Sequence, residues 1–294
     1  MPGKLKQFMK LQKYKAGLFV FSNLLLLNMI ACGQNPNFYI YICFGQSNME
    51  GQGTIEPQDL NVDSRFKVFQ ALDCPNLNRT KCTWYTALPP TCQCNSKLSP
   101  ADYFGRTMVA NLPDSITIGI INVAVSSSDI RLFDKYLYQD FDSAHTESWF
   151  INRVAAYEWN PYEYIIQLAK WAQEDGIIKG ILLHQGETNT GQIQWLSYVR
   201  KIYYVMLNDL SLMAEDVPLL AGEVVSAEGN CCSSMNSIIK MLPQAIPTAC
   251  VISSAGCPSQ DVAHFNSEGY RMLGTRYAIE MLSIMGHIIT CHEK

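Results

Sequence analysis

The stretch from Phe38 to Gly51 reads FYIYICFGQSNMEG, and it decides the fold. Its first seven residues are aromatic or apolar, which predicts a strand buried on both faces of a parallel sheet. A polar turn follows and carries one serine, Ser47. Because catalytic groups in open α/β sheets lie just beyond the carboxyl ends of strands, Ser47 is a candidate nucleophile. The alternative is a serine that caps the next helix.

Alternating strand and helix patterns continue along the chain. Arg65–Leu72 is a plausible strand, and helical spacing extends over Ser99–Ala110, Pro161–Glu174, Gln192–Ala214, Ser234–Leu242 and the segment after Phe265. Clear buried strands are predicted at Phe38–Phe44, Thr117–Val125, Ile177–His184, Val217–Val225 and Ala249–Ser253. This alternation predicts a three-layer α/β/α sandwich around a mainly parallel, five-stranded sheet.

Length and composition fit one enzyme-sized domain. The chain has 294 residues, 48% of them hydrophobic, and a net charge of −4. It is long enough to bury a sizeable core, and we expect residues 33–294 to form a single domain. A mildly acidic chain without a long basic run gives no reason to expect nucleic acid or an anionic membrane surface as a partner. A neutral or weakly charged substrate is easier to accommodate.

The N-terminus has the pattern of an export signal. Five lysines precede a largely apolar run from Ala16 to Ala31, which predicts a signal peptide or lipoprotein signal over residues 1–32. Cys32 follows and is a candidate for a lipid anchor, although Ile30 is larger than that pattern prefers. We therefore expect a secreted or cell-surface protein. A retained membrane anchor is the alternative, but the uninterrupted apolar part is short for a span.

Eight cysteines fall in two clusters within loop-like sequence. Zinc ligation is one interpretation, but the spacings lack the usual ligand pattern and no histidine lies inside either cluster, so disulfides are favoured. Adjacent cysteines seldom bridge each other, so we expect Cys231 or Cys232 to pair at a distance. The segment Cys74–Pro100 is interpreted as a long loop that could form one wall of a substrate cleft. The clusters are Cys74, Cys82, Cys92, Cys94 and Cys231, Cys232, Cys250, Cys257.

Three separate motifs resemble one family. FGQSNMEG at the first strand, HQGETN after Ile177–His184, and DVAHF from Asp261 to Phe265 resemble the SGNH (GDSL-like) hydrolases. The similar branch contains the sialate O-acetylesterases and the acetylxylan esterases of carbohydrate esterase family 6. The resemblance implies a catalytic triad of Ser47, His264 and Asp261, with no metal and no cofactor.

The resemblance also implies an oxyanion hole. Its donors would be the backbone N–H groups of Ser47 and Ser127 and the side-chain amide of Gln185. The family usually has glycine where this chain has Ser127. A serine keeps the N–H but lacks the freedom of glycine at positive φ, so the sequence leaves open whether the oxyanion hole is weaker.

Two acids compete for the role of orienting His264. Asp261 lies three residues away on the same loop, whereas Glu187 follows a different strand at the same edge of the sheet. Asp261 is the favoured partner and Glu187 is the alternative.

These features together predict a serine esterase that removes acetyl groups from carbohydrate. Motif spacing is closer to the acetylxylan esterases, so acetylated xylan is the favoured substrate. The alternatives are a sialate O-acetylesterase and a catalytically weak carbohydrate-binding protein of the same fold. The sequence does not indicate which oligomeric state the protein has.

Overall fold

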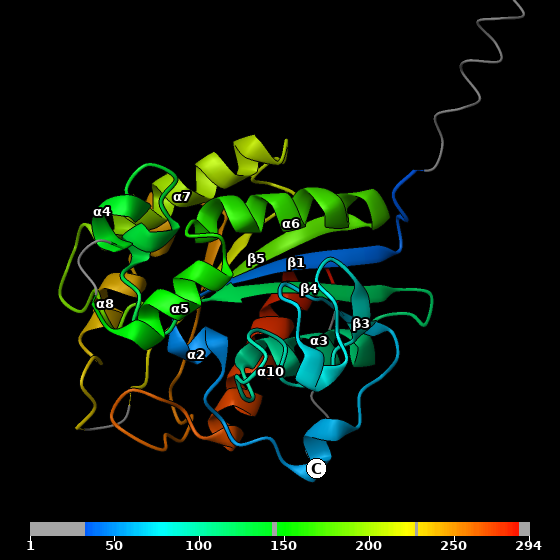
Figure 1. Ribbon diagram of the computed structural model, residues 1–294, viewed down its shortest axis with the longest axis horizontal. Coiled ribbons are helices and arrows are strands. Elements are labelled where there is room, and N and C mark those ends of the chain that lie inside the picture. The colour runs from blue at the N-terminus through cyan, green and yellow to red at the C-terminus, as the bar shows by residue number, and fades with distance from the viewer. Residues whose placement is uncertain (1–32, 143–145, 227–228, 288–294) are drawn as a thin grey trace, which may run out of the picture. The chain divides into compact units, whose positions relative to one another are not determined.

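One sheet organises the chain from Asn35 onward, as seen in a computed structural model that describes residues 33–142, 146–226 and 229–287 (Figure 1). Its strand order in this part of the chain is β3-β2-β4-β1-β5-β6-β7, and all neighbours are parallel except β2 and β3. The predicted signal segment, residues 1–32, and its candidate anchor Cys32 lie outside the described residues. The strands are β1 (Phe38–Gly45), β2 (Phe66–Phe69), β3 (Trp84–Thr86), β4 (Thr117–Ala124), β5 (Ile177–His184), β6 (Leu219–Gly222) and β7 (Ala249–Ile252).

Helices cover both faces of the sheet, so the predicted α/β class is confirmed. Helices α6 and α7 lie on one face, while α3 and α10 pack together on the other (Figure 1). The longer helices are α3 (Pro100–Asn111), α5 (Ser148–Ala156), α6 (Pro161–Asp175), α7 (Trp195–Asp209) and α10 (Ser267–Ile284). The shorter ones are α2 (Ser47–Glu50), α4 (Tyr138–Asp142), α8 (Met235–Ile239), α9 (Leu242–Ala245) and the 3-10 turns Pro57–Leu60, Pro75–Leu77 and Ile130–Phe133.

The sheet separates the hydrophobic core into two halves, and β1 contributes side chains to both. Ile40 and Ile42 pack on the α6 and α7 side, whereas Tyr41 and Cys43 pack on the α3 and α10 side. All four side chains are fully buried, as expected for a central strand of a parallel sheet. Burial of one such isoleucine contributes about 1.5–3 kcal/mol, so β1 is fixed firmly beneath the turn that follows it.

The sheet has seven strands in the described residues, not the five predicted. The plausible strand at residues 65–72 is present as β2, and β3 lies within the segment interpreted as a loop. Strand β3 has only three half-buried residues and pairs antiparallel with β2. Trp84 holds it in place by packing against Phe38 and Phe69, which are distant in sequence. Local periodicity therefore could not reveal it.

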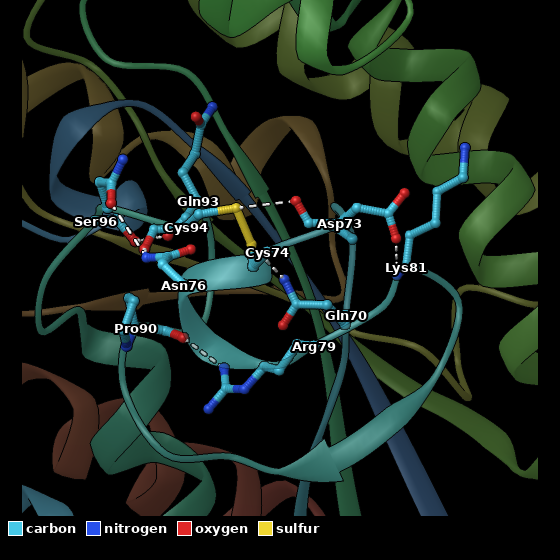
Figure 2. The surroundings of a disulfide bond; sticks show 12 residues. Gln70, Asp73, Cys74, Asn76, Arg79, Lys81, Pro90, Gln93, Cys94 and Ser96 are labelled. Atoms are coloured by element: carbon cyan, nitrogen blue, oxygen red, sulfur yellow. Dashed lines mark hydrogen bonds between the residues drawn. A yellow bond between two sulfur atoms is a disulfide. The ribbon is translucent and has the colours of Figure 1, made fainter.

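Two disulfides are present in the described residues. One joins Cys74 to Cys94 within the loop before α3, as Figure 2 shows. The other joins the neighbours Cys231 and Cys232, so the prediction that they do not bridge each other is wrong. The other two cysteines of that cluster face α10 instead, since Cys257 Sγ contacts Arg276. Cys250 interacts there with Glu280, and burial, with Glu280 as a smaller cause, raises the pKa of the Cys250 thiol to about 11.

Among the described helices, none combines the length and the apolar character needed to cross a bilayer.

Candidate active site

Three strands end in register at the same edge of the sheet. Gly45 at the end of β1 lies opposite Ala124 of β4 on one side and His184 of β5 on the other. A Cβ atom at Gly45, where φ is +149°, would overlap the His184 carbonyl oxygen, so only glycine fits this close approach. The turns that follow these strands carry Ser47, Ser127 and Gln185, which the parallel sheet brings to one edge.

Ser47 lies within hydrogen-bonding distance of His264. Its Oγ is 2.9 Å from His264 Nε2, and it stands at the first position of the one-turn helix α2. His264 lies in the loop between β7 and α10, 217 residues further along the chain. A serine hydroxyl against an imidazole nitrogen is the arrangement that activates a nucleophile.

Asp261 holds the other side of the imidazole. Its Oδ2 is 2.9 Å from His264 Nδ1, and its Oδ1 accepts hydrogen bonds of 2.8 Å from the backbone N–H groups of Ala263 and His264. Partial burial raises the pKa of Asp261, but these hydrogen bonds outweigh it and hold the pKa below its ordinary value. The carboxylate is therefore ionised where it faces His264.

Glu187 contacts Asn48 in the described structure, and no hydrogen bond joins it to His264 there. Its Oε1 accepts from Asn48 Nδ2 at 2.5 Å, and the same Nδ2 donates to the Ala263 carbonyl at 2.9 Å. Asn48 Oδ1 accepts from the Tyr270 hydroxyl at 2.6 Å. Asn48 and Glu187 thus tie the turn after Ser47 to the loop that carries His264. Asn48 lies beside Ser47 in the motif, but its role could not be predicted from sequence because its partners are distant in the chain.

Ser127 already has the backbone conformation that glycine favours. Its φ is +61°, in the left-handed region, so the serine adopts the turn geometry despite its side chain. Within the described residues, no carbonyl or carboxylate accepts a hydrogen bond from the backbone N–H of Ser47 or Ser127. Both donors are therefore free to bind an anionic oxygen.

Glu50 fixes the turn that contains Ser127, and the sequence analysis missed it. Its buried carboxylate accepts from the backbone N–H of Ser126 at 2.8 Å and from the Ser126 hydroxyl at 2.7 Å. Arg153 of α5 donates to it through Nε at 2.9 Å. The sequence did contain a signal for this role, because Glu50 is an acidic residue directly after a buried strand and its turn. A charge at such a position needs hydrogen-bond or ionic partners.

Gln185 is engaged elsewhere, so the geometry does not support its predicted oxyanion role. The side chain is fully buried. Its Nε2 has three acceptors in range, Gln46 Oε1 and the Ser128 carbonyl at 3.1 Å and Asn189 Oδ1 at 2.7 Å. Trp195 donates to its carbonyl oxygen. This amide has only two hydrogens, so acceptors within the protein use both of them. Gln185 instead links the turns that follow β1, β4 and β5.

Residues 33–142, 146–226 and 229–287 contain no group of three or more His, Cys, Asp or Glu side chains arranged to hold a metal ion. His184 is fully buried, with Nε2 at 3.1 Å from the Glu223 carbonyl oxygen, and burial lowers its pKa.

Comparisons with known proteins agree with this fold and motif set. The family model described as "Carbohydrate esterase, sialic acid-specific acetylesterase" matches residues 37–283. A solved structure of a protein from Arabidopsis thaliana is 19% identical, with a TM-score of 0.65 over 85% of this chain and 99% of that one. The crystal structure of NanS is 14% identical, with a TM-score of 0.55 over 86% of this chain and 99% of that one. These two likenesses concern the fold, whereas the family match extends over most of the sequence. The chain therefore belongs to the carbohydrate esterase family of sialic acid-specific acetylesterases, as the resemblance of its motifs predicted.

Proposed function

We propose that this carbohydrate acetylesterase works through an acyl-enzyme on Ser47, with His264 as the base and Asp261 as its orienting acid. The hydrogen-bonded series Ser47 Oγ, His264 Nε2 and Nδ1, and Asp261 Oδ2, with 2.9 Å at each contact, carries this proposal. Ser47 Oγ attacks the acetyl carbonyl while its proton passes to His264 Nε2. The imidazolium then protonates the departing sugar oxygen, leaving acetyl-Ser47.

Deacylation reverses these roles. His264 takes a proton from water, the resulting hydroxide attacks the acetyl carbonyl, and acetate leaves as the proton returns to Ser47 Oγ. The negative oxygen formed in each half-reaction would be stabilised by the Ser47 and Ser127 backbone N–H groups. Gln185 supports this site indirectly, through its contacts with Gln46 and Ser128.

Acetylated xylan is the proposed substrate, on the basis of the motif spacing. The second candidate is O-acetylated sialic acid, which the description of the matching family favours. Parallel assays of acetate release from acetylated xylan and from O-acetylated sialic acid test the choice. Faster release from the sialic acid ester would overturn the xylan proposal. A protein that binds sugar without turnover would fail to hydrolyse even a simple aryl acetate.

We further propose that the protein is exported and acts outside the cytoplasm. The basic and apolar pattern of residues 1–32 supports this, as do the Cys74–Cys94 and Cys231–Cys232 disulfides, since disulfides persist in oxidising compartments. Fractionation of the producing cells tests export. Incorporation of labelled fatty acid that is lost in Cys32→Ala would support a lipid anchor, and equal labelling of both proteins would contradict it.

A further inference from the structure

A cavity of about 510 Å³ lies between α5 and the disulfide-bonded loop, and its lining residue Arg153 contacts Glu50 of α2, the helix that begins at Ser47. This volume falls within the range of about 300–1,000 Å³ typical of small-molecule sites. One wall is a single face of α5, where Trp149, Asn152, Arg153 and Ala156 recur at helical spacing. We propose that this cavity binds an uncharged sugar unit next to the acetylated one, so that the substrate is a neutral acetylated glycan. This inference rests on the proposed esterase function.

The opposite wall of the cavity is held in place by bonds within the protein. Figure 2 shows the Cys74–Cys94 disulfide joining the segment at Asp73 to the turn at Gln93–Ser96, and both segments line the cavity. Asn76 Nδ2 donates to the Cys94 carbonyl at 3.0 Å, and Ser96 Oγ donates to the Gln93 carbonyl at 2.9 Å. A fixed wall lowers the entropy lost when a ligand binds.

The cavity is joined to the proposed oxyanion turn by two contacts. Arg153 donates to Glu50, which holds Ser126 beside Ser127. Next to the lining residue Gln93, Cys92 Sγ lies 3.9 Å from the carbonyl oxygen of Ala124, the last residue of β4. Glu50 is also three positions after Ser47 on one helical turn, where Cβ atoms are about 5–6 Å apart. A chain of sugars could therefore occupy the cavity while one acetyl group reaches Ser47.

An exposed aromatic ring suits the apolar face of a sugar. Trp149 is 43% exposed, and its orientation is supported by the Arg153 guanidinium, 5.4 Å from the ring centroid. A pyranose presents a face of C–H groups that can pack on such a ring, while its hydroxyls need partners that both donate and accept. The side chains of Asn152 and Asn95 supply such amides at the rim.

The charges favour an uncharged ligand. Two charged side chains line the cavity, Asp73 and Arg153. The charge of Arg153 is already paired with the buried Glu50 carboxylate, whereas the one hydrogen bond to the Asp73 side chain within the described part of the chain comes from the Lys81 backbone N–H. The carboxylate of an acidic sugar would meet Asp73 with no unpaired cation among the described lining residues. Hydroxyl groups, by contrast, can donate to Asp73.

Binding can be measured separately from turnover in a Ser47→Ala protein. Xylotetraose serves as the neutral probe and N-acetylneuraminic acid as the acidic one, each titrated while the tryptophan indole N–H signals are followed by NMR. We expect xylotetraose to shift the Trp149 signal and to bind more tightly than the acidic sugar. Trp149→Ala should weaken xylotetraose binding by about tenfold or more. Trp171→Ala is the matched control, since Trp171 is 46% exposed on α6 and does not line the cavity.

Several results would overturn the inference. These are tighter binding of N-acetylneuraminic acid, a Trp149 signal that does not respond to xylotetraose, or equal losses in Trp149→Ala and Trp171→Ala. Asn152→Ala provides a second variant on the same face of α5 if Trp149→Ala does not fold. The esterase proposal fails separately: a wild-type protein that binds xylotetraose through Trp149 but releases acetate from no ester would contradict that proposal alone.

Discussion

Ser47 Oγ and His264 Nε2 lie 2.9 Å apart although 217 residues separate them. The parallel sheet makes this contact possible, because β1 and β7 run in the same direction and their following loops lie at the same edge. Among the described residues, the proposed nucleophile therefore follows the first strand and its proposed base follows the last.

Loss of either residue should abolish turnover. We expect Ser47→Ala and His264→Ala each to lower kcat by about three orders of magnitude or more, because triad members act as a unit. The double variant should be little worse than either single one. Initial rates on an aryl acetate measure this effect. Half of the activity remaining in His264→Ala would contradict the assignment of the base.

Substitution of Asp261 should lower kcat, whereas substitution of Glu187 should lower stability. Asp261→Asn removes the acceptor that fixes the His264 ring, so we expect kcat to fall at least about a hundredfold in a folded protein. Glu187→Gln can keep a hydrogen bond with Asn48, so its effect should fall mainly on stability. Thermal midpoint and kcat measured on both variants separate the roles. A folded, inactive Glu187→Gln beside an active Asp261→Asn would reverse them.

Glu50 should act as a positioning residue for the Ser127 turn. Glu50→Gln weakens the hold on Ser126, so we expect kcat to fall about ten- to a hundredfold with a smaller change in KM, as for the displacement of an oxyanion donor. Glu174→Gln on α6 is the matched control, since Glu174 is exposed and distant from this turn. Equal kinetics in the two folded variants would contradict the role of Glu50.

Ser127 should be replaceable by glycine but not by a branched residue. Because φ is already +61°, Ser127→Gly should leave kcat within about threefold and change stability by less than about 1 kcal/mol. Ser127→Val places a β-branched side chain in the left-handed region and should lower both activity and stability. Steady-state kinetics and thermal unfolding test the pair. A large gain in kcat for Ser127→Gly would mean that the serine does weaken the oxyanion hole.

Acid should destabilise the wild type more than Asp261→Asn. The pKa of Asp261 is below its ordinary value of 3.8 in the folded protein, so the folded state binds fewer protons than the unfolded chain near that pH. The resulting stabilisation is present above the ordinary pKa and is lost as pH falls through the folded one. The drop in thermal midpoint between pH 5 and pH 3 should therefore be larger in the wild type than in Asp261→Asn. Parallel decreases would argue against these Asp261 contacts.

The sequence determined the fold class, and its motifs indicated the residues proposed for the chemistry. The uncharged run Phe38–Phe44 predicted a central strand, and this strand is present as β1, whereas β3 has no such run and was not predicted. Ser47 was a candidate because it follows an apolar run, whereas Asp261 and His264 were identified through the resemblance of the DVAHF motif to the family. The one-residue spacing of Cys231 and Cys232 gave a wrong prediction, since a statistical preference against adjacent bridges ignores where other cysteines point.

Tertiary structure decided which polar groups meet. Gln185 was a candidate oxyanion donor and Glu187 a candidate acid for His264, and both lie in the same turn. In the folded protein Gln185 binds Gln46 and Asn189, and Glu187 binds Asn48. Strand β3, the hold of Glu50 on the Ser127 turn and the cavity beside α5 likewise depend on contacts between segments far apart in the chain. Sequence periodicity reports which face of a segment is apolar, whereas hydrogen bonds between loops depend on distances that only the assembled sheet sets.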